Sequence, residues 1–177
     1  NITLVSTFGT TQGPARTPER GQFLSERHYL LWSPSPTSRL RVGKFRQSFG
    51  INTPNHNRLM RSQLGFGFFS ETYNMEFTQF YETYEVTLGT SLGRFDQPYK
   101  ARSEKNVSGH FTYYLNENSR WGGSYLLGES DRERRNLFSI NSVFPISEHW
   151  LGLFEIDYEN KHLTANPGQA IDSFASF

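Results

Sequence analysis

Residues 106–158 read NVSGHFTYYLNENSRWGGSYLLGESDRERRNLFSINSVFPISEHWLGLFEIDY, and this stretch decides the fold. It contains four runs in which apolar and polar residues alternate, separated by short polar clusters. In the first run, Phe111 and Tyr113 fall on one side of the alternation, whereas His110 and Thr112 fall on the other. Successive side chains of a β-strand face opposite sides of a sheet. The stretch therefore predicts four strands, each with an apolar and a polar face.

The remaining chain adds six strands of the same kind. We expect them at residues 2–8, 22–32, 39–51, 72–81, 84–92 and from 171 onward. The alternation changes parity inside residues 39–51, and Gly43 is predicted to absorb the change as a β-bulge. Residues 82–83 are interpreted as a tight hairpin turn, the alternative being one long strand over 72–92. The sequence thus predicts about ten strands, no helix, and one all-β, antiparallel, up-and-down domain over residues 1–177.

Composition restricts the class of protein. The chain is long enough for a sizeable core, its net charge of +1 gives no electrostatic case for nucleic-acid binding, and it has no cysteine for disulfides or thiolate sites. No run approaches the roughly 20 apolar residues of a membrane helix. Hydrophobic residues make up 35% of the chain and aromatic residues 16%. This combination suits a transmembrane β-barrel with a wet lumen, and also an aromatic-rich soluble β-sandwich that binds carbohydrate.

The connections between the predicted strands favour the barrel. Long loops at 9–20, 52–71, 94–105, 129–136 and 159–170 alternate with short turns at 33–38, 82–83, 116–120 and 145–149. Outer-membrane barrels sort their connections in this way, with short turns at one rim and long loops at the other. Tryptophan and tyrosine prefer the membrane interface. We therefore predict an interfacial girdle of Trp32, Tyr81, Tyr84, Trp121 and Trp150 at the turn rim, with Tyr158 near the opposite rim. Between the rims, the predicted lipid-facing band contains Phe77, Leu88, Phe111, Tyr125, Ile140 and Phe154.

Residues 41–61, RVGKFRQSFGINTPNHNRLMR, followed by SETYNMEF at residues 70–77, resemble segments of large porin-like proteins. The overall pattern resembles Gram-negative outer-membrane porin-type β-barrels over nearly the whole chain. This resemblance implies a location in the bacterial outer membrane and a passive channel for small hydrophilic solutes. The run from residue 171 is short and weakly alternating for a closing strand. The alternatives are therefore a ten-stranded barrel and a section of a larger one.

One loop and the polar faces of the strands supply candidates for a lumen. The segment 52–71 is long for a hairpin loop and carries three basic residues. If it folds inward, these residues oppose acidic side chains, and opposed charges across a narrow pore set ion selectivity and solute size. The alternative is an ordinary solvated extracellular loop. The predicted lumen and constriction residues are His56, Arg58, Arg61, Glu76, Glu85 and His110.

Chemistry beyond transport is not indicated. The five histidines are scattered, without the spacing of a metal site. His110 shares a polar face with Ser108 and Thr112, which is one arrangement of a base beside a nucleophile, but a polar lumen wall explains it more simply. We therefore expect no enzyme activity, no catalytic residue, no cofactor and no metal. Among membrane proteins, the remaining alternative is a structural or assembly barrel without a pore.

The expected partners are membrane lipids, small solutes, and either an oligomer partner or further barrel segments, with no nucleic acid. Two predicted loops carry cations that suit the phosphates of lipopolysaccharide. Asp131 and Glu133 interleave with these cations and weaken the preference for a purely anionic target. The cations are Lys100, Arg102, Lys105, Arg132, Arg134 and Arg135.

Overall fold

The computed structural model describes residues 1–10, 23–51, 64, 71–94, 104–164 and 166–176. These residues form ten strands and, within these ranges, no helix. The strands are β1 (Ile2–Thr10), β2 (Phe23–Ser35), β3 (Ser38–Phe45), β4 (Thr72–Phe80), β5 (Tyr84–Ser91), β6 (Lys105–Asn116), β7 (Ser119–Glu129), β8 (Glu133–Ser147), β9 (Trp150–Leu163) and β10 (Asn166–Ser176). Over the same ranges, nothing is helical, long and apolar enough to be a membrane-spanning helix.

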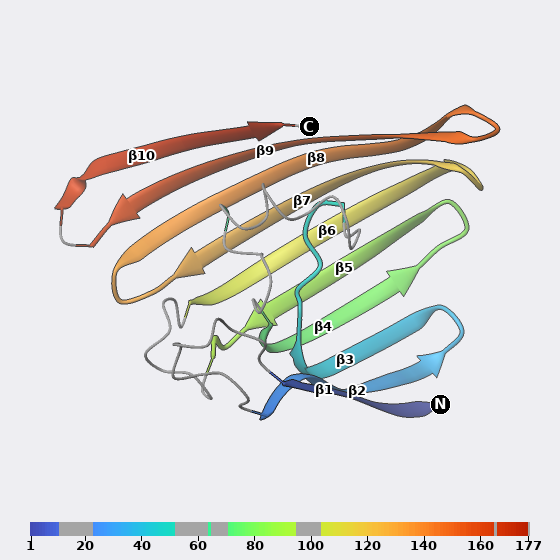
Figure 1. Cartoon of the computed structure of the whole chain (residues 1–177), viewed down its shortest axis with the longest axis horizontal. Coiled ribbons are helices and arrows are strands. Elements are labelled where there is room, and N and C mark those ends of the chain that lie inside the picture. Colours follow the sequence, from blue (N-terminus) through green and yellow to red (C-terminus); the bar gives the residue numbers. More distant parts are fainter. Residues whose placement is uncertain (11–22, 52–63, 65–70, 95–103, 165, 177) are drawn as a thin grey trace.

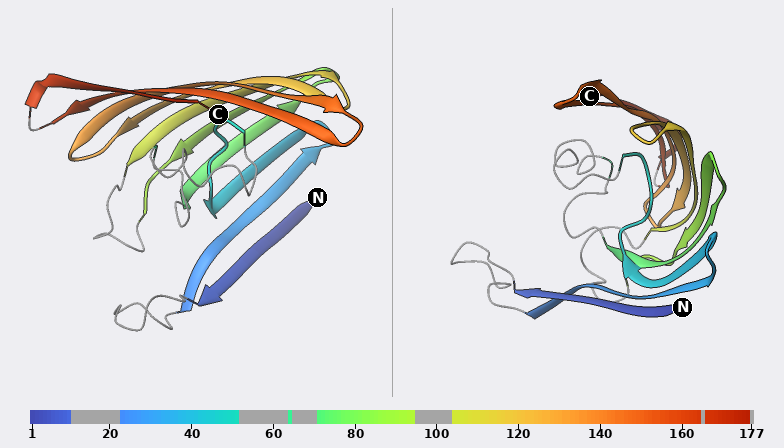
Figure 2. Two further views of the ribbon diagram at one scale, coloured as in Figure 1. Left: turned by 45° about the horizontal axis from the view of Figure 1, so that its top comes forward. Right: turned by 90° about the vertical axis from the view of Figure 1, so that its right-hand side faces the viewer.

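The strands form one antiparallel sheet in which each strand pairs with the next along the chain, from β1 to β10 (Figure 1). β1 and β10 are the two edges of this sheet, which is open. Figure 2 shows the sheet rolled into an arc, with residues 46–51, which follow β3, on its concave side. The predicted all-β, up-and-down architecture of ten strands is confirmed at this level. The described strands join one continuous sheet and not the two packed sheets of a sandwich.

Side-chain alternation gives the sheet two unlike faces. The register aligns apolar residues of successive strands in rows across the convex face. One such row contains Phe77, Leu88, Gly109, Tyr125, Phe138 and Tyr158. All six residues of the predicted lipid-facing band lie on this face and are 42–60% exposed. The apolar side chains of this fold are therefore mainly on its outside.

The predicted tight hairpin at residues 82–83 is confirmed. β4 ends at Phe80 and β5 begins at Tyr84, and the two strands pair in antiparallel register. The Tyr81 amide donates a hydrogen bond of 2.8 Å to the carbonyl of Tyr84. The two tyrosine rings stack with their centroids 4.3 Å apart. Aromatic stacking therefore supports a turn that contains neither glycine nor asparagine.

Several predicted connections are shorter than expected. Most of the predicted loops at 129–136 and 159–170 is strand, because β8 begins at Glu133, β9 continues to Leu163 and β10 begins at Asn166. Charged residues join the ladder here through their backbone while their side chains project from the sheet, as in the pair of Arg135 with Lys161. β8 also continues through Pro145, and the register shifts just after it because proline donates no ladder hydrogen bond.

β3 ends earlier than predicted, and Gly43 is not a bulge. The expected strand over residues 39–51 stops pairing with β4 at Phe45. Gly43, with φ of 139°, lies in unbroken register with both neighbouring strands. A Cβ at this position would lie 2.4 Å from the carbonyl oxygen of His28, so the close approach of β2 requires glycine. The change of parity in the sequence instead marks the point at which the chain leaves the sheet.

Candidate functional site

The concave face of the sheet is polar and largely buried. Thr87, Ser139, Asn141, Glu155 and Asp157 lie on it and are at most 6% exposed. Together with the apolar convex face, this reverses the usual distribution, in which charged side chains are almost never fully buried. Buried polar groups need hydrogen-bond partners. Some of these partners come from residues 46–51 (RQSFGI), which follow β3 and are called here the inner segment.

The inner segment is held against the concave face by hydrogen bonds to four strands. In each bond an N–H group of the segment is the donor and a side-chain oxygen of the sheet is the acceptor. The segment has left the ladder, so its N–H groups need such acceptors. The bonds are Ser48 N to Glu76 Oε1 (2.7 Å), Gln47 Nε2 to Asn106 Oδ1 (2.7 Å), Gly50 N to Ser124 Oγ (2.8 Å) and Ile51 N to Glu155 Oε2 (3.1 Å). The acceptors belong to β4, β6, β7 and β9, so one short segment ties together much of the arc.

Gly50 allows the closest of these approaches. Its φ of +57° is in the left-handed region, which glycine adopts at no steric cost. A Cβ at this position would lie 1.7 Å from Oε1 of Glu155. The same carboxylate accepts the Ile51 amide and, at 3.2 Å, the hydroxyl of Ser139. Both the backbone conformation and the available space therefore require glycine beside Glu155.

A small apolar cluster seats the inner segment on this otherwise polar face. It contains Phe49 of the segment, Leu64, and two leucines of the sheet, Leu126 and Leu137. All four side chains are at most 4% exposed. Leu126 and Leu137 are direct neighbours on β7 and β8. Their burial stabilises the crossing chain against the wall, since each fully buried leucine or phenylalanine contributes about 1.5–3 kcal/mol.

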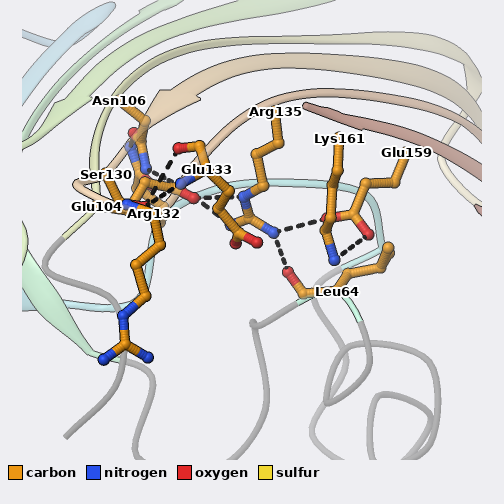
Figure 3. A network of polar contacts seen from close by, with 10 residues as sticks. Leu64, Glu104, Asn106, Ser130, Arg132, Glu133, Arg135, Glu159 and Lys161 are labelled. Atoms are coloured by element: carbon orange, nitrogen blue, oxygen red, sulfur yellow. Dashed lines mark hydrogen bonds and ion pairs between the residues drawn. The ribbon is translucent and has the colours of Figure 1, made fainter. Parts of the chain in front are cut away.

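A buried ion network lies next to this cluster, near the rim of the long connections (Figure 3). Arg135, 4% exposed, binds the carboxylates of Glu104 and Glu159, the latter at 3.0 Å, and donates to the carbonyl of Leu64. Lys161 pairs with the other oxygen of Glu159 at 2.7 Å. The prediction that Arg135 belongs to a charged loop is wrong. Its position in β8 directs its side chain to the concave face, where it fixes the chain at Leu64.

A polar cavity of about 480 Å³ lies on the concave face between the inner segment and the rim of the short turns. Arginines of β3 and β7 and acids of β4 and β5 contribute to its wall. Arg41 and Glu76 form an ion pair at 2.5 Å, and the Arg39 guanidinium lies 4.7 Å from the ring centre of Phe80. The lining includes Arg39, Arg41, Ser48, Gly50, Glu76, Glu85, Thr87, His110, Arg120 and Asn141. The lining thus offers hydrogen-bond donors and acceptors as well as positive and negative side chains, and these groups suit contact with hydrated polar solutes.

His110 connects this cavity wall to the inner segment. Its Nδ1 lies 2.7 Å from Oγ of Ser124, and its Nε2 lies 3.0 Å from the hydroxyl of Thr112. Ser124 Oγ also accepts the Gly50 amide. The neighbour considered from the sequence, Ser108, contacts Gln47 at 3.3 Å. The imidazole therefore bonds to a cross-strand serine that positions the inner segment.

The structure brings together three of the six predicted lumen residues. Glu76, Glu85 and His110 line the same cavity, on three consecutive strands. His56, Arg58 and Arg61 lie outside the described residues, as does most of the segment 52–71. Sequence reasoning missed the inner segment, which it assigned to a strand. The available signal was the parity change after Val42 followed by a glycine at position 50.

The predicted girdle residues lie on the convex face or in the turns. Trp32, Trp121 and Trp150 are 44%, 56% and 72% exposed and lie close to the short turns. Tyr81 and Tyr84 flank the turn between β4 and β5. Tyr158 lies within β9, opposite Phe138 of β8 and Phe174 of β10. The three tryptophans and the two turn tyrosines thus lie along one rim of the sheet.

The described ranges contain no group of three His, Asp or Glu side chains placed to bind a metal ion. No protein-family model matches the chain, and no curated protein matches it. The fold and the site therefore define a structural class alone, an open antiparallel arc with a polar, partly occupied concave face and an apolar convex face.

Proposed function

We propose that this chain belongs to a Gram-negative outer-membrane β-barrel that acts as a passive channel for small hydrophilic solutes. The observation that supports this most directly is the inverted distribution of side chains. Large apolar residues such as Phe111 and Ile140 lie on the convex face, and charged residues such as Glu76 and Glu155 lie on the concave one. In transmembrane barrels the apolar face contacts lipid and the polar face contacts the aqueous lumen. β6 and β7, with 12 and 11 residues, reach the roughly 9–11 residues that a tilted strand needs to cross the hydrocarbon core.

The arc is proposed to belong to a barrel of more than ten strands. Small barrels leave interior space for little more than their own side chains. Here the concave side also holds the inner segment and Leu64. β1, with the sequence ITLVSTFGT, has no charge and no proline, which are the features that protect natural edge strands from pairing. We expect β1 and β10 to pair with further strands, from the same chain or from another.

In this channel the inner segment narrows the lumen and the cavity beside it forms a vestibule on the turn side. Solute would pass between the inner segment and the strands that complete the barrel. Glu76, Glu85, Arg41 and Arg120 contribute charges of both signs to the vestibule. Such a wall replaces part of the hydration shell of a polar solute without chemistry. The inner segment and Leu64 occupy part of the concave side, and this also favours a second candidate function, a structural barrel that conducts no solute.

Planar-bilayer recording with the purified, assembled barrel tests the proposal. We expect discrete, ohmic conductance steps after insertion from detergent, because the polar concave face would line a water-filled lumen that crosses the membrane. The control is a mock preparation from cells that lack the protein. Insertion without conductance would favour the structural barrel. A protein that stays monodisperse without detergent would contradict both membrane candidates.

Substitution of Gly50 is expected to loosen the constriction. In Gly50→Ala, the left-handed backbone costs an L-residue about 1–2 kcal/mol, and the added Cβ displaces the carboxylate of Glu155. The inner segment then loses its anchor on β9, and single-channel conductance rises. Gly109→Ala is the matched control, because its Cβ would meet only Leu88, at an ordinary 3.8 Å. Equal conductance of the two variants would show that the inner segment does not determine the width of the lumen.

A further inference from the structure

A groove of about 680 Å³ opens near the ends of the strands at the rim of the long connections. The part of it that lies deeper along the strands is apolar and includes the exposed side chains of Val107 and Leu127, whereas the exposed Leu92 follows β5 at the level of Lys105. The part nearest the rim is charged and includes Lys105 and Arg134. These five residues point from the convex face, the side that the proposed function assigns to lipid. The groove is therefore amphiphilic, with its charged end above its apolar end.

The charged residues form a row that the sheet register fixes. Lys105 of β6 pairs with Glu129 of β7, which pairs with Arg134 of β8, which pairs with His162 of β9. All four side chains are exposed. Lys105 and Arg134 are two strand spacings apart, about 10 Å. Their long, flexible side chains can reach a single tetrahedral anion between them.

The row carries more positive than negative charge. Lys105 and Arg134 face one carboxylate, that of Glu129, and none of these three side chains forms an ion pair within the described part of the chain. Beyond β4 and β5, Lys44 of β3 and His28 of β2 pair directly at the same rim, but Lys44 is only 7% exposed and adds no accessible charge to the groove. The short turns at the opposite rim instead carry Glu82, Glu117 and Glu148. Cations on the convex face thus gather at one rim, immediately above the apolar band.

We propose that this groove binds the phosphate group of a membrane lipid, with Lys105 and Arg134 on the phosphate and an acyl chain along Val107 and Leu127. The inference rests on the proposed membrane location. Charge-assisted hydrogen bonds from lysine and arginine to phosphate are strong, and basic residues beside an apolar membrane surface recognise anionic lipid headgroups. Glu129 lies between the two cations and weakens the site. The geometry assigns this rim to the leaflet that is richer in phosphate-bearing lipid.

The test measures lipid bound to the detergent-solubilised chain by native mass spectrometry. The probes are diphosphorylated lipid A and the same lipid after enzymatic removal of its phosphates. We expect the chain to retain the phosphorylated form preferentially. The variant Lys105→Gln/Arg134→Gln should bind it roughly thirtyfold more weakly, because each cation near a membrane surface contributes about 1 kcal/mol. Glu129→Gln should bind it more tightly.

The matched control is Arg132→Gln, which removes a cation from the exposed turn at the same rim but outside the groove. It should bind lipid A like the unmodified chain. Equal binding of the phosphorylated and dephosphorylated lipids, or equal loss in the double variant and the control, would overturn the proposal. Competition by inorganic phosphate at the same concentration as lipid would assign the site to a free anion and overturn it as well. If the chain does not enter bilayers at all, the proposed function fails first, and conductance recording detects this independently.

Discussion

Arg135→Ala is expected to destabilise the fold by about 3–5 kcal/mol, the largest effect predicted for a single substitution in this chain. Arg135 is 4% exposed and binds Glu104, which is 6% exposed, and Glu159, which is 2% exposed. Removal of the guanidinium leaves these carboxylates buried without their cation and releases the carbonyl of Leu64. Lys161 continues to pair with Glu159, so most of the penalty is expected from Glu104.

Urea titration of the refolded chain in detergent or lipid measures this loss, with the midpoint converted through an unchanged slope. The control is Arg132→Ala, an arginine near the same rim whose side chain is exposed, and its cost should stay within about 0.5 kcal/mol. A double-mutant cycle with Glu104→Ala should give less than the sum of the single losses, because the second change removes the stranded charge. Equal costs for the two arginines would show that the network is not buried as described.

The architecture could be predicted from the sequence because it depends on a local pattern. In β6, alternate residues such as Phe111 and Thr112 differ in polarity, and this difference repeats with period two in most strands. The hairpin at residues 82–83 followed from the same rule, since the alternation restarts after it. The residues at which the strands end could not be predicted from this pattern. Glu133 and Lys161 extend the ladder through backbone groups, and neither their charge nor their spacing reveals this.

The inner segment could not be predicted because its partners are distant in the sequence. Phe45, Phe49 and Ile51 alternate as a strand would, and hydropathy alone assigns them to one. What removes Phe49 and Ile51 from the sheet is the set of acceptors on β4, β7 and β9, of which Glu155 is 104 positions away from Ile51. The role of Gly50 likewise depends on the position of that carboxylate. Single-sequence patterns contain the parity change but not the contacts that explain it.

Phe111→Arg provides the sharpest test of whether the convex face contacts lipid. Phe111 lies in the middle of β6 and is 45% exposed, whereas Leu115 lies on the same face next to the turn and is 56% exposed. In water, arginine at either position would be solvated, and the two costs would be small and similar. In a bilayer, arginine at the midplane of a barrel costs about 2–4 kcal/mol, and near the interface about 0–1 kcal/mol.

The expected result is therefore a strong difference between two substitutions on one strand. The free energy of unfolding from lipid vesicles should fall by roughly 2–4 kcal/mol in Phe111→Arg and by at most about 1 kcal/mol in Leu115→Arg. Phe154→Arg on β9 should behave like Phe111→Arg, because Phe154 belongs to the same predicted band and is 42% exposed. If all three variants unfold together with the unmodified chain, the convex face does not contact hydrocarbon. Exposure in the fold is nearly the same at positions 111 and 154 and higher at 115, and a loss that spares Leu115 is the result expected from depth in a membrane.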